Sequence, residues 1–422
     1  MRTPIRTLAV IAAAACTTML VACTGPGTGA GTEPAAGAGP EGDGDVTLTY
    51  YSWNNQASFQ PIVDAFEEKY PDITIDMSSA NGNSAEYAQT LLTRASGNQL
   101  PDVFHLSLES QSELIDGERV RDITDEEFFQ GANLAGTEIF QRDGRVFGMS
   151  TGAWAGVIIY NKQLLSQVGY DEVPTDIDGF IELGKALSGS GVTPYLEEVS
   201  SASPSLQPML GGYYAASGKS DVDIFDGEAS FSSWVPVLNQ WKRLIDEGVL
   251  SKDVVGVSGD QVKQSFLSGE VAMYRSGTWD FIDIETAGID FGTAPFPAVD
   301  GGEPFIGGGA ESPFALSAAL EGEKLKAAQT FLAFINSAEG LQLAEEHLSS
   351  VSTSANYDAN VAPQIADVYE EYIQGGKYYW TVWPTNGAVM GQEFAAQMQL
   401  FILGEVTAEE LTAALDAKWS AQ

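Results

Sequence analysis

The chain has 422 residues, which is too long for one ordinary hydrophobic core and suits two large domains. Apolar residues make up 44% and charged residues 18%, which excludes a wholly disordered chain. Acidic residues outnumber basic ones 58 to 20, a formal charge of −38, and this excludes nucleic-acid binding through phosphate neutralisation. Two cysteines and two histidines are too few for a Cys/His metal cluster or a disulfide framework. We therefore expect no metal and no cofactor.

The N-terminal residues carry targeting signals. A basic start (Arg2, Arg6) precedes short apolar runs that end in Leu-Val-Ala-Cys at Cys23, so residues 1–22 are predicted to be a secretory signal peptide. Leu-Val-Ala-Cys resembles the lipobox of bacterial lipoproteins, which implies a lipid on Cys23 and anchoring at the outer face of the cytoplasmic membrane. The alternative is an ordinary signal cleaved nearby. Residues 23–45 lack large apolar side chains and predict a flexible tether.

Strand and helix patterns alternate from residue 46 onward. The β-branched and aromatic run 46–53 predicts a buried strand. Phe59, Ile62, Val63 and Phe66 then form an apolar helical stripe, with Pro61 expected in the first turn of that helix. Further strands are predicted over 72–77, 102–106 and 157–160, and helices over 86–96, 174–187, 234–247, 321–337 and, after a Thr407–Glu410 capping box, at the C-terminal end.

The first of these elements already indicate where a ligand binds. Strand, helix, strand, helix and strand within some sixty residues predict right-handed crossovers and a mostly parallel sheet. Ligands collect at the C-terminal ends of such strands. We therefore expect binding residues in the loops that begin at Trp53, Ser79 and Ser107.

Six segments together resemble a known family, the extracellular solute-binding proteins of ABC transporters, in their carbohydrate-binding, maltose-binding-protein-like group. The segments are LTYYSWNN (48–55) with the helix after it, LLTRASGNQLPDVFHLS (91–107), GRVFGMSTGAWAGVIIYNKQLL (144–165), FLSGEVAMYRSGTWD (266–280), FGTAPFPAVDGGEPFIGGGAESPFALSA (291–318) and AAQTFLAFINSAEG (327–340). Ser150 stands where the family usually has proline, and Asp176-Ile177 replace its usual helix start.

The resemblance implies an α/β fold of the periplasmic-binding-protein kind, with two lobes, a ligand cleft between them and hinge crossovers. We place the crossovers near residues 150–155, 294–298 and 349–353. The first lobe is then expected to comprise residues 46–152 plus 297–350, and the second lobe residues 153–296 plus 351–422.

The same resemblance implies a sugar site, and sugar chemistry explains its residue types. An aromatic ring that covers one face of a pyranose contributes on the order of 1–2 kcal/mol through buried apolar area, while amides and carboxylates bond its hydroxyls. The family positions fall on Asn55, Glu109, Trp154, Trp279 and the glycines Gly308 and Gly309. Further candidates, chosen for their place near strand ends or in an aromatic cluster, are Trp53, Asn54, Asn81, Glu311, Trp380 and Trp383.

Three alternatives stay open at this point. Glu311 either takes a sugar hydroxyl or pairs with Arg275, and one of Trp380 and Trp383 is expected in the cleft. For the whole chain we expect a monomeric sugar receptor that serves a permease, with no catalytic residue. The other candidates are a polyamine or other small-solute receptor of the same fold, which the negative charge favours, and a secreted glycoside hydrolase.

Overall fold

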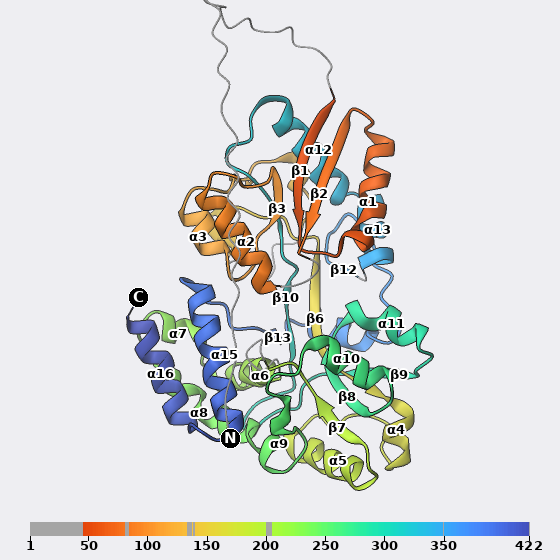
Figure 1. The fold of residues 1–422 in the computed structure, drawn as a ribbon, viewed down its shortest axis with the longest axis vertical. Coiled ribbons are helices and arrows are strands. Elements are labelled where there is room, and N and C mark those ends of the chain that lie inside the picture. Colours follow the sequence, from red (N-terminus) through yellow and green to blue (C-terminus); the bar gives the residue numbers. More distant parts are fainter. Residues whose placement is uncertain are drawn as a thin grey trace, which may run out of the picture. The chain divides into compact units, whose positions relative to one another are not determined.

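The computed structural model describes residues 45–80, 84–132, 137, 140–199, 205–348 and 350–421, and its main strands form two sheets, one in each lobe (Figure 1). The predicted signal peptide, Cys23 and Asn81 lie outside the described residues. Within the described residues, no helix combines the length and the apolar character needed to cross a bilayer, and no group of His, Cys, Asp and Glu side chains is arranged to hold a metal.

The first lobe is built on a four-stranded sheet with the order β11-β3-β1-β2. Its strands are β1 (Val46–Ser52), β2 (Ile73–Ser79), β3 (Val103–His105) and β11 (Phe314–Leu316). β1 runs parallel to both β2 and β3, while β11 runs antiparallel to β3. A mostly parallel sheet was predicted, and the pairing of β1 to β3 confirms it.

Helices cover both faces of this sheet because alternate residues of β1 point to opposite sides. Leu48 and Tyr50 pack against α1 and α12 on one face, and Tyr51 packs against α2 and α3 on the other (Figure 1). The elements around the sheet are α1 (Gln56–Lys69), α2 (Ser84–Ser96), α3 (Gln111–Asp116), η1 (Glu127–Phe129), the hairpin β4 (Gln141–Arg142) and β5 (Arg145–Val146), α12 (Gly322–Ile335) and α13 (Ala338–Leu348).

The second lobe is built around one long strand, β6 (Gly152–Asn161), in a sheet with the order β13-β10-β6-β8-β7. β9 and β12 also pair with β6. The remaining strands are β7 (Thr193–Leu196), β8 (Val271–Ser276), β9 (Phe291–Ala294), β10 (Ile306–Ala310), β12 (Val351–Ser352) and β13 (Tyr378–Tyr379). β10, which falls in the predicted first-lobe segment 297–350, therefore belongs to the second sheet.

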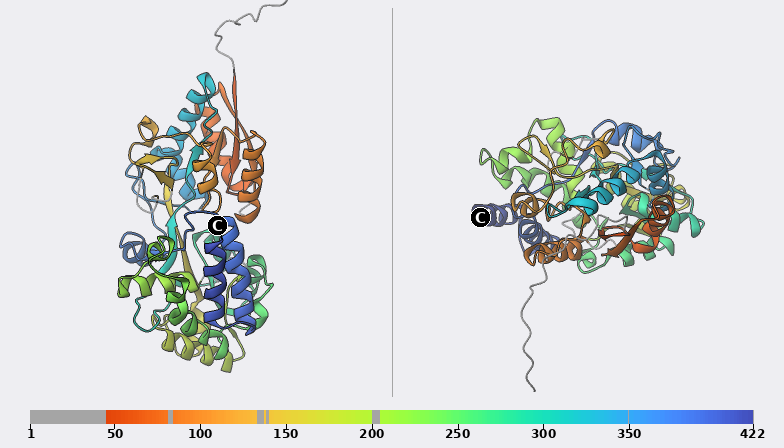
Figure 2. Two further views of the ribbon diagram at one scale, coloured as in Figure 1. Left: turned by 90° about the vertical axis from the view of Figure 1, so that its left-hand side faces the viewer. Right: turned by 90° about the horizontal axis from the view of Figure 1, so that it is seen from above.

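Two hydrophobic cores flank the second sheet, again through alternate residues of β6. Ile158 and Tyr160 pack with α5, α6, α8, α15 and α16, and Val157 and Ile159 pack with α10, α11 and η6. Figure 2 shows α15 and α16 packed side by side. The helices are α4 (Lys162–Gln167), α5 (Ile177–Gly189), α6 (Leu206–Ser217), α7 (Asp221–Phe225), η3 (Phe231–Trp234), α8 (Val235–Trp241), α9 (Arg243–Asp246), η4 (Lys252–Val254), α10 (Gly259–Leu267), η5 (Thr278–Asp280), α11 (Phe281–Thr286), α14 (Ala366–Val368), η6 (Tyr369–Ile373), α15 (Gly387–Leu403) and α16 (Ala408–Ser420).

Two details of the predicted helices are wrong. Pro61 lies in the second turn of α1, because the helix begins at Gln56, where Asn55 caps it by accepting a hydrogen bond from Ala57 N. The helix predicted over 234–247 is divided at Lys242, where the backbone N–H of Ile245 bonds to the carbonyl three residues before it. This tighter turn separates α8 from α9.

The chain crosses between the lobes in three neighbouring segments. The first enters β6 at Gly152, the second is the link 311–313 between β10 and β11, and the third leads into β12. The second crossover was predicted near 294–298, which is wrong, because Phe296 pairs with Phe305 and Ala298 with Asp176, both in the second lobe. The apolar run that ends at Ala298 stays inside one lobe, and the chain leaves that lobe only after β10.

Candidate functional site

Three tryptophans from three elements gather around one arginine in the second lobe. They are Trp154 of β6, Trp279 of η5 and Trp380, which follows β13. The guanidinium carbon of Arg275 lies 5.9, 5.4 and 5.8 Å from their ring centroids, respectively. The rings of Trp154 and Trp380 also meet edge to face, 5.4 Å apart. We call Trp154, Trp279 and Trp380 the tryptophan cluster. Trp279 is 44% exposed, which is unusual for so large an apolar side chain.

Arg275 is a charged residue in an otherwise buried strand. In the described part of the chain its Nε is buried without a hydrogen-bond partner, and its side chain forms no ion pair. Burial lowers the pKa of Arg275, and the nearby acidic groups of Tyr195, Glu197, Asp280 and Glu198 oppose that effect. A buried N–H without an acceptor costs about 1–3 kcal/mol, and contact with an aromatic face returns about 0.5–2 kcal/mol.

Glycines make the room that this cluster needs. A Cβ on Gly156 would lie 2.8 Å from Nη2 of Arg275, and a Cβ on Gly277 would lie 2.3 Å from the ring of Trp279. Gly308 and Gly309, predicted to approach a ligand, are paired with Ala155 and Trp154 of β6. A Cβ on Gly308 would lie 3.0 Å from Tyr378, so the space beside this glycine is filled by the protein's own aromatic residues.

Trp380 and Trp383 lie in different surroundings. Trp383 is 7% exposed and is packed in the core of the second lobe against Phe225, Phe231 and Phe394. Its prediction as a ligand residue does not fit this burial, so we leave it out of the proposed site. Trp380 is half-buried and belongs to the tryptophan cluster.

The first-lobe candidates stand at the C-terminal end of β1. The half-buried ring of Trp53 packs edge to face on Tyr87, with the centroids 5.4 Å apart. The backbone of Asn54 accepts from the Ser79 hydroxyl and donates to that of Ser52. Asn55 uses its side-chain oxygen to cap α1, as described above. The structure thus holds this loop in place by local hydrogen bonds, and leaves the Trp53 ring partly exposed.

Glu109 lies where the first lobe touches the second. It follows β3 in a turn closed by a hydrogen bond between the Ser107 and Ser110 hydroxyls. A Cβ on Gly387, the first residue of α15, would lie 3.2 Å from Leu108 O and 3.5 Å from Cα of Glu109. Burial raises the pKa of Glu109, although Ser107 and its own backbone N–H favour the charged form. The α15 N-terminus, which favours negative charge, therefore lies beside this carboxyl residue.

Glu311, in the second crossover, forms hydrogen bonds with residues of the other two crossovers. Its carboxylate accepts from the Ser350 hydroxyl at 2.9 Å, and its backbone N–H donates to Gly152 O at 2.9 Å. The Ser150 hydroxyl, at the position where the family usually has proline, donates to the carbonyls of both Gly152 and Glu311. Burial raises the pKa of Glu311 to about 7. Of the two expected roles, pairing with Arg275 is not what the structure shows, because Glu311 bonds to Ser350.

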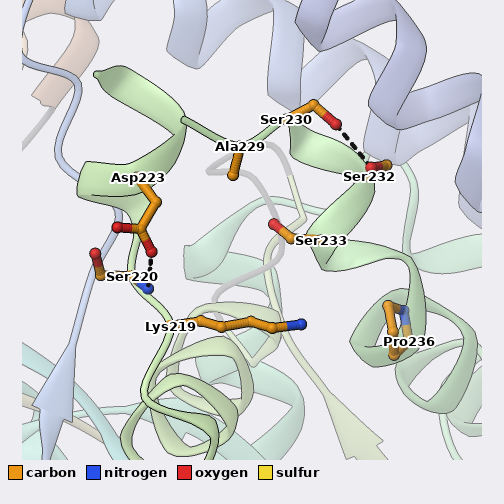
Figure 3. Close-up of a pocket in the computed structure, with 8 residues that line it drawn as sticks. All are labelled: Lys219, Ser220, Asp223, Ala229, Ser230, Ser232, Ser233 and Pro236. Atoms are coloured by element: carbon orange, nitrogen blue, oxygen red, sulfur yellow. Dashed lines mark hydrogen bonds between the residues drawn. The ribbon is translucent and has the colours of Figure 1, made fainter. Parts of the chain in front are cut away.

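A hollow opens on the second lobe, between α7 and η3, with a volume of about 410 Å³ (Figure 3). Its polar groups serve the local fold: Asp223 accepts from the Ser220 backbone N–H to cap α7, and the Ser230 and Ser232 hydroxyls bond to each other. Lys219 lies over the Tyr213 ring. With no aromatic ring among the residues that line it, this hollow does not suit a sugar face.

Sequence reasoning identified each ring of the cluster but missed the residue at its centre. The available signal was a charge at position 275 within a run of buried residues, Ala272, Met273 and Tyr274. Gly156, which makes room for the guanidinium, gave no signal of its own because glycine in a strand has many causes.

Comparisons with known proteins identify the family and the fold. Residues 52–342 match the family described as bacterial extracellular solute-binding protein. A family 1 extracellular solute-binding protein from Bifidobacterium longum subsp. infantis is 36% identical, with 90% of this chain and 100% of that chain covered and a TM-score of 0.75.

Two more distant structures share the fold. The GacH receptor of Streptomyces glaucescens, solved without ligand and with acarbose, is 20% identical over 89% of this chain and 98% of its own, with a TM-score of 0.73. A sugar transporter protein from Bacillus licheniformis in complex with stachyose is 19% identical over 89% and 100%, with a TM-score of 0.69. The chain belongs to the bacterial extracellular solute-binding protein family.

Proposed function

We propose that this chain is the substrate-binding lipoprotein of an ABC sugar importer, which captures a mono- or oligosaccharide between its lobes and delivers it to the permease. The observation that carries this is the tryptophan cluster, with the exposed face of Trp279 (44%) as its most accessible ring. Flat apolar faces suit the C–H face of a pyranose. The complexes of similar proteins with acarbose and stachyose support a saccharide as the ligand.

On the first lobe, the site would be completed by Trp53, Asn54, Asn55 and Glu109, and on the second by the tryptophan cluster; Asn81 stays a candidate from the sequence alone. A ligand that contacts both lobes stabilises the closed arrangement and so shifts a pre-existing equilibrium. A tenfold shift needs about 1.4 kcal/mol of differential affinity, which one or two stacked rings supply. The permease would then recognise the closed form, while a lipid on Cys23 holds the receptor, as a monomer, at the outer face of the membrane.

A polyamine receptor is the main alternative, and one contact argues against it. An aromatic cage holds an ammonium group against its rings, and here a guanidinium of the same charge already lies 5.9, 5.4 and 5.8 Å from the three ring centroids of the cluster. A second cation placed there would be repelled by Arg275.

A hydrolase is less well supported, although Gly148-Met149-Ser150-Thr151-Gly152 matches the Gly-x-Ser-x-Gly pattern of nucleophile elbows. Ser150 is only 2% exposed and its hydroxyl donates to two backbone carbonyls at the crossover. The segment leads into β6 and not from a strand into a helix, so the strained turn of such an elbow is missing.

Isothermal titration calorimetry tests the proposal with stachyose, raffinose, maltotriose, xylotetraose and chitotriose, and with spermidine as the competing class. We expect one or more of the saccharides to bind, with compaction in small-angle scattering and no binding of spermidine. Release of a chromophore from nitrophenyl glycosides would favour a hydrolase. Binding of spermidine without any saccharide would contradict the proposal.

A further inference from the structure

We propose that Arg275 is a ligand-contacting specificity residue, which donates hydrogen bonds from its guanidinium to uncharged oxygen atoms of the saccharide and keeps cationic solutes out of the tryptophan cluster. The inference rests on the proposed sugar-binding function and names what that site selects.

The side chain of Arg275 has hydrogen-bonding capacity that the protein does not use. A guanidinium carries five N–H donors, and buried donors in folded proteins nearly always have partners. Among the described residues, Nε of Arg275 is buried without a partner, and the residue as a whole is half-buried, so the rest of the guanidinium is open to solvent or to a ligand. An oxygen-rich ligand at the tryptophan cluster would supply the acceptors that the protein itself does not.

The acidic residues near Arg275 favour an uncharged ligand. Glu197, Glu198 and Asp280 favour the charged form of Arg275, although burial raises the pKa of Glu197 itself to about 7. Asp280 is itself held by Lys263 and by the Tyr274 and Ser276 hydroxyls. A ligand carboxylate would meet these acids as well as Arg275, whereas a hydroxyl or ring oxygen accepts a hydrogen bond without that repulsion.

The space around the Arg275 guanidinium suits a planar group. The guanidinium lies within 6 Å of three ring centroids, and Gly156 leaves its Nη2 only the room of a missing Cβ. A planar guanidinium stacks on aromatic faces and keeps its edge free for donors in the ring plane. A lysine ammonium has no such plane, so Arg275 and lysine are not interchangeable here.

The experiment compares three variants by calorimetry with the saccharide of the panel that the wild type binds best. Arg275→Met keeps an apolar stem and removes the charge and the donors, and we expect at least tenfold weaker binding. The ligand-free variant should melt at or above the wild-type temperature, since a buried N–H without a partner has been removed. Arg275→Lys should fold like the wild type and bind at least fivefold more weakly. Arg243→Met is the matched control, because Arg243 is ion-paired with Asp178 and Glu247, and its affinity should equal that of the wild type.

The outcomes separate this inference from the proposed function. A wild type that binds a saccharide, with Arg275→Met or Arg275→Lys within twofold of it, contradicts the inference and leaves the function standing. Weaker binding that comes with a lower melting temperature of ligand-free Arg275→Met and an unchanged Arg275→Lys assigns Arg275 a structural role and also contradicts it. A wild type that binds no saccharide removes both.

Two further titrations test the selectivity. Spermidine should not bind the wild type, and its binding would contradict the exclusion of cations. A xylooligosaccharide that bears glucuronic acid should bind no more tightly than xylotetraose, because its carboxylate meets the acids around Arg275. Tighter binding of the acidic sugar would show that the ligand oxygen at Arg275 is charged and would overturn that part of the inference.

Discussion

Asp221 and Arg275 are both ionisable residues among aromatic side chains of the second lobe. They differ in their hydrogen bonds: the side chain of Asp221 has several partners, and that of Arg275 has none among the described residues. Asp221 accepts hydrogen bonds from the Tyr214 hydroxyl at 2.6 Å, from Trp234 Nε1 at 3.2 Å and from the Tyr379 hydroxyl. Arg275 is in contact with three aromatic rings and its side chain bonds to none of the described residues.

The difference separates a charge that serves the fold from one that is available to a ligand. The donors around Asp221 come from α6, η3 and β13, so this carboxylate joins elements that are distant in the sequence. Buried polar groups with all partners in place make a structure unique, and removing one partner is costly. Arg275 has no such partners to lose, so we expect its replacement to change binding more than stability.

Asp221→Ala should produce the largest change, a loss of about 3–5 kcal/mol in the free energy of unfolding, because several hydrogen bonds to one buried carboxylate are lost. It removes three hydrogen bonds to one carboxylate and leaves the buried Tyr214 hydroxyl without its acceptor, while Trp234 Nε1 keeps its bond to Tyr214 and the Tyr379 hydroxyl keeps Thr381. Urea denaturation followed by circular dichroism measures the loss. Asp226→Ala is the control, because Asp226 is exposed at the end of the same helix, α7, and its loss should stay below about 1 kcal/mol. Equal losses in the two variants would mean that Asp221 does not hold these elements together.

Glu311 stands between these two extremes, because its side chain is bonded to one hydroxyl, that of Ser350. Its pKa is raised from the ordinary 4.5 to about 7 by burial, so between these pH values the folded protein holds a proton that the unfolded chain releases. Stability from this group is therefore present at low pH and is lost as the pH rises from 4.5 to 7, by at most about 3 kcal/mol.

Glu311→Gln should remove that loss. The difference in unfolding free energy between Glu311→Gln and the wild type should therefore grow in favour of the variant from pH 4.5 to 7. Denaturation at three pH values measures it. Glu339→Gln, at an exposed ion pair with Lys69, provides the control and should show no comparable slope. A difference that is flat with pH would mean that Glu311 ionises at its ordinary pKa in the folded protein.

The sequence predicts those features of the fold and the site that depend on residues close together in the chain. The strand at 46–52, the stripe on α1 and the Thr407 capping box follow from periods and caps, and the structure confirms them. The second crossover was misplaced because a run of apolar residues does not reveal which sheet it joins. Trp380 and Trp383 lie three residues apart with similar neighbours, and only the packing of distant helices decides that Trp383 is core. Arg275 was missed for the same reason, since its three rings come from separate segments.

Trp279→Ala tests whether the tryptophan cluster, which surrounds Arg275, binds the saccharide. The exposed part of this ring holds no core contact, so the melting temperature of the ligand-free protein should stay nearly unchanged, while saccharide affinity falls by at least about tenfold, or about 1.4 kcal/mol. Calorimetry and thermal denaturation measure the two quantities. Trp419→Ala is the contrasting control, because Trp419 packs on Phe225 and Trp383; it should lower stability and leave affinity unchanged. Unchanged affinity in Trp279→Ala would remove Trp279 from the site.

The smallest effect is expected for residues 379–381, which lie between Asp221 and Arg275 and contact both. Tyr379 and Thr381 bond toward Asp221 and Gln207, while Trp380 between them packs on Trp154 and Arg275, as alternate residues of an extended chain must. Tyr379→Phe removes one donor to Asp221 and so loosens the segment that orients Trp380. We expect a stability loss of about 1 kcal/mol and a two- to threefold loss of saccharide affinity, measured by denaturation and calorimetry. A loss of stability with unchanged saccharide affinity would show that the two charges are not linked through this segment.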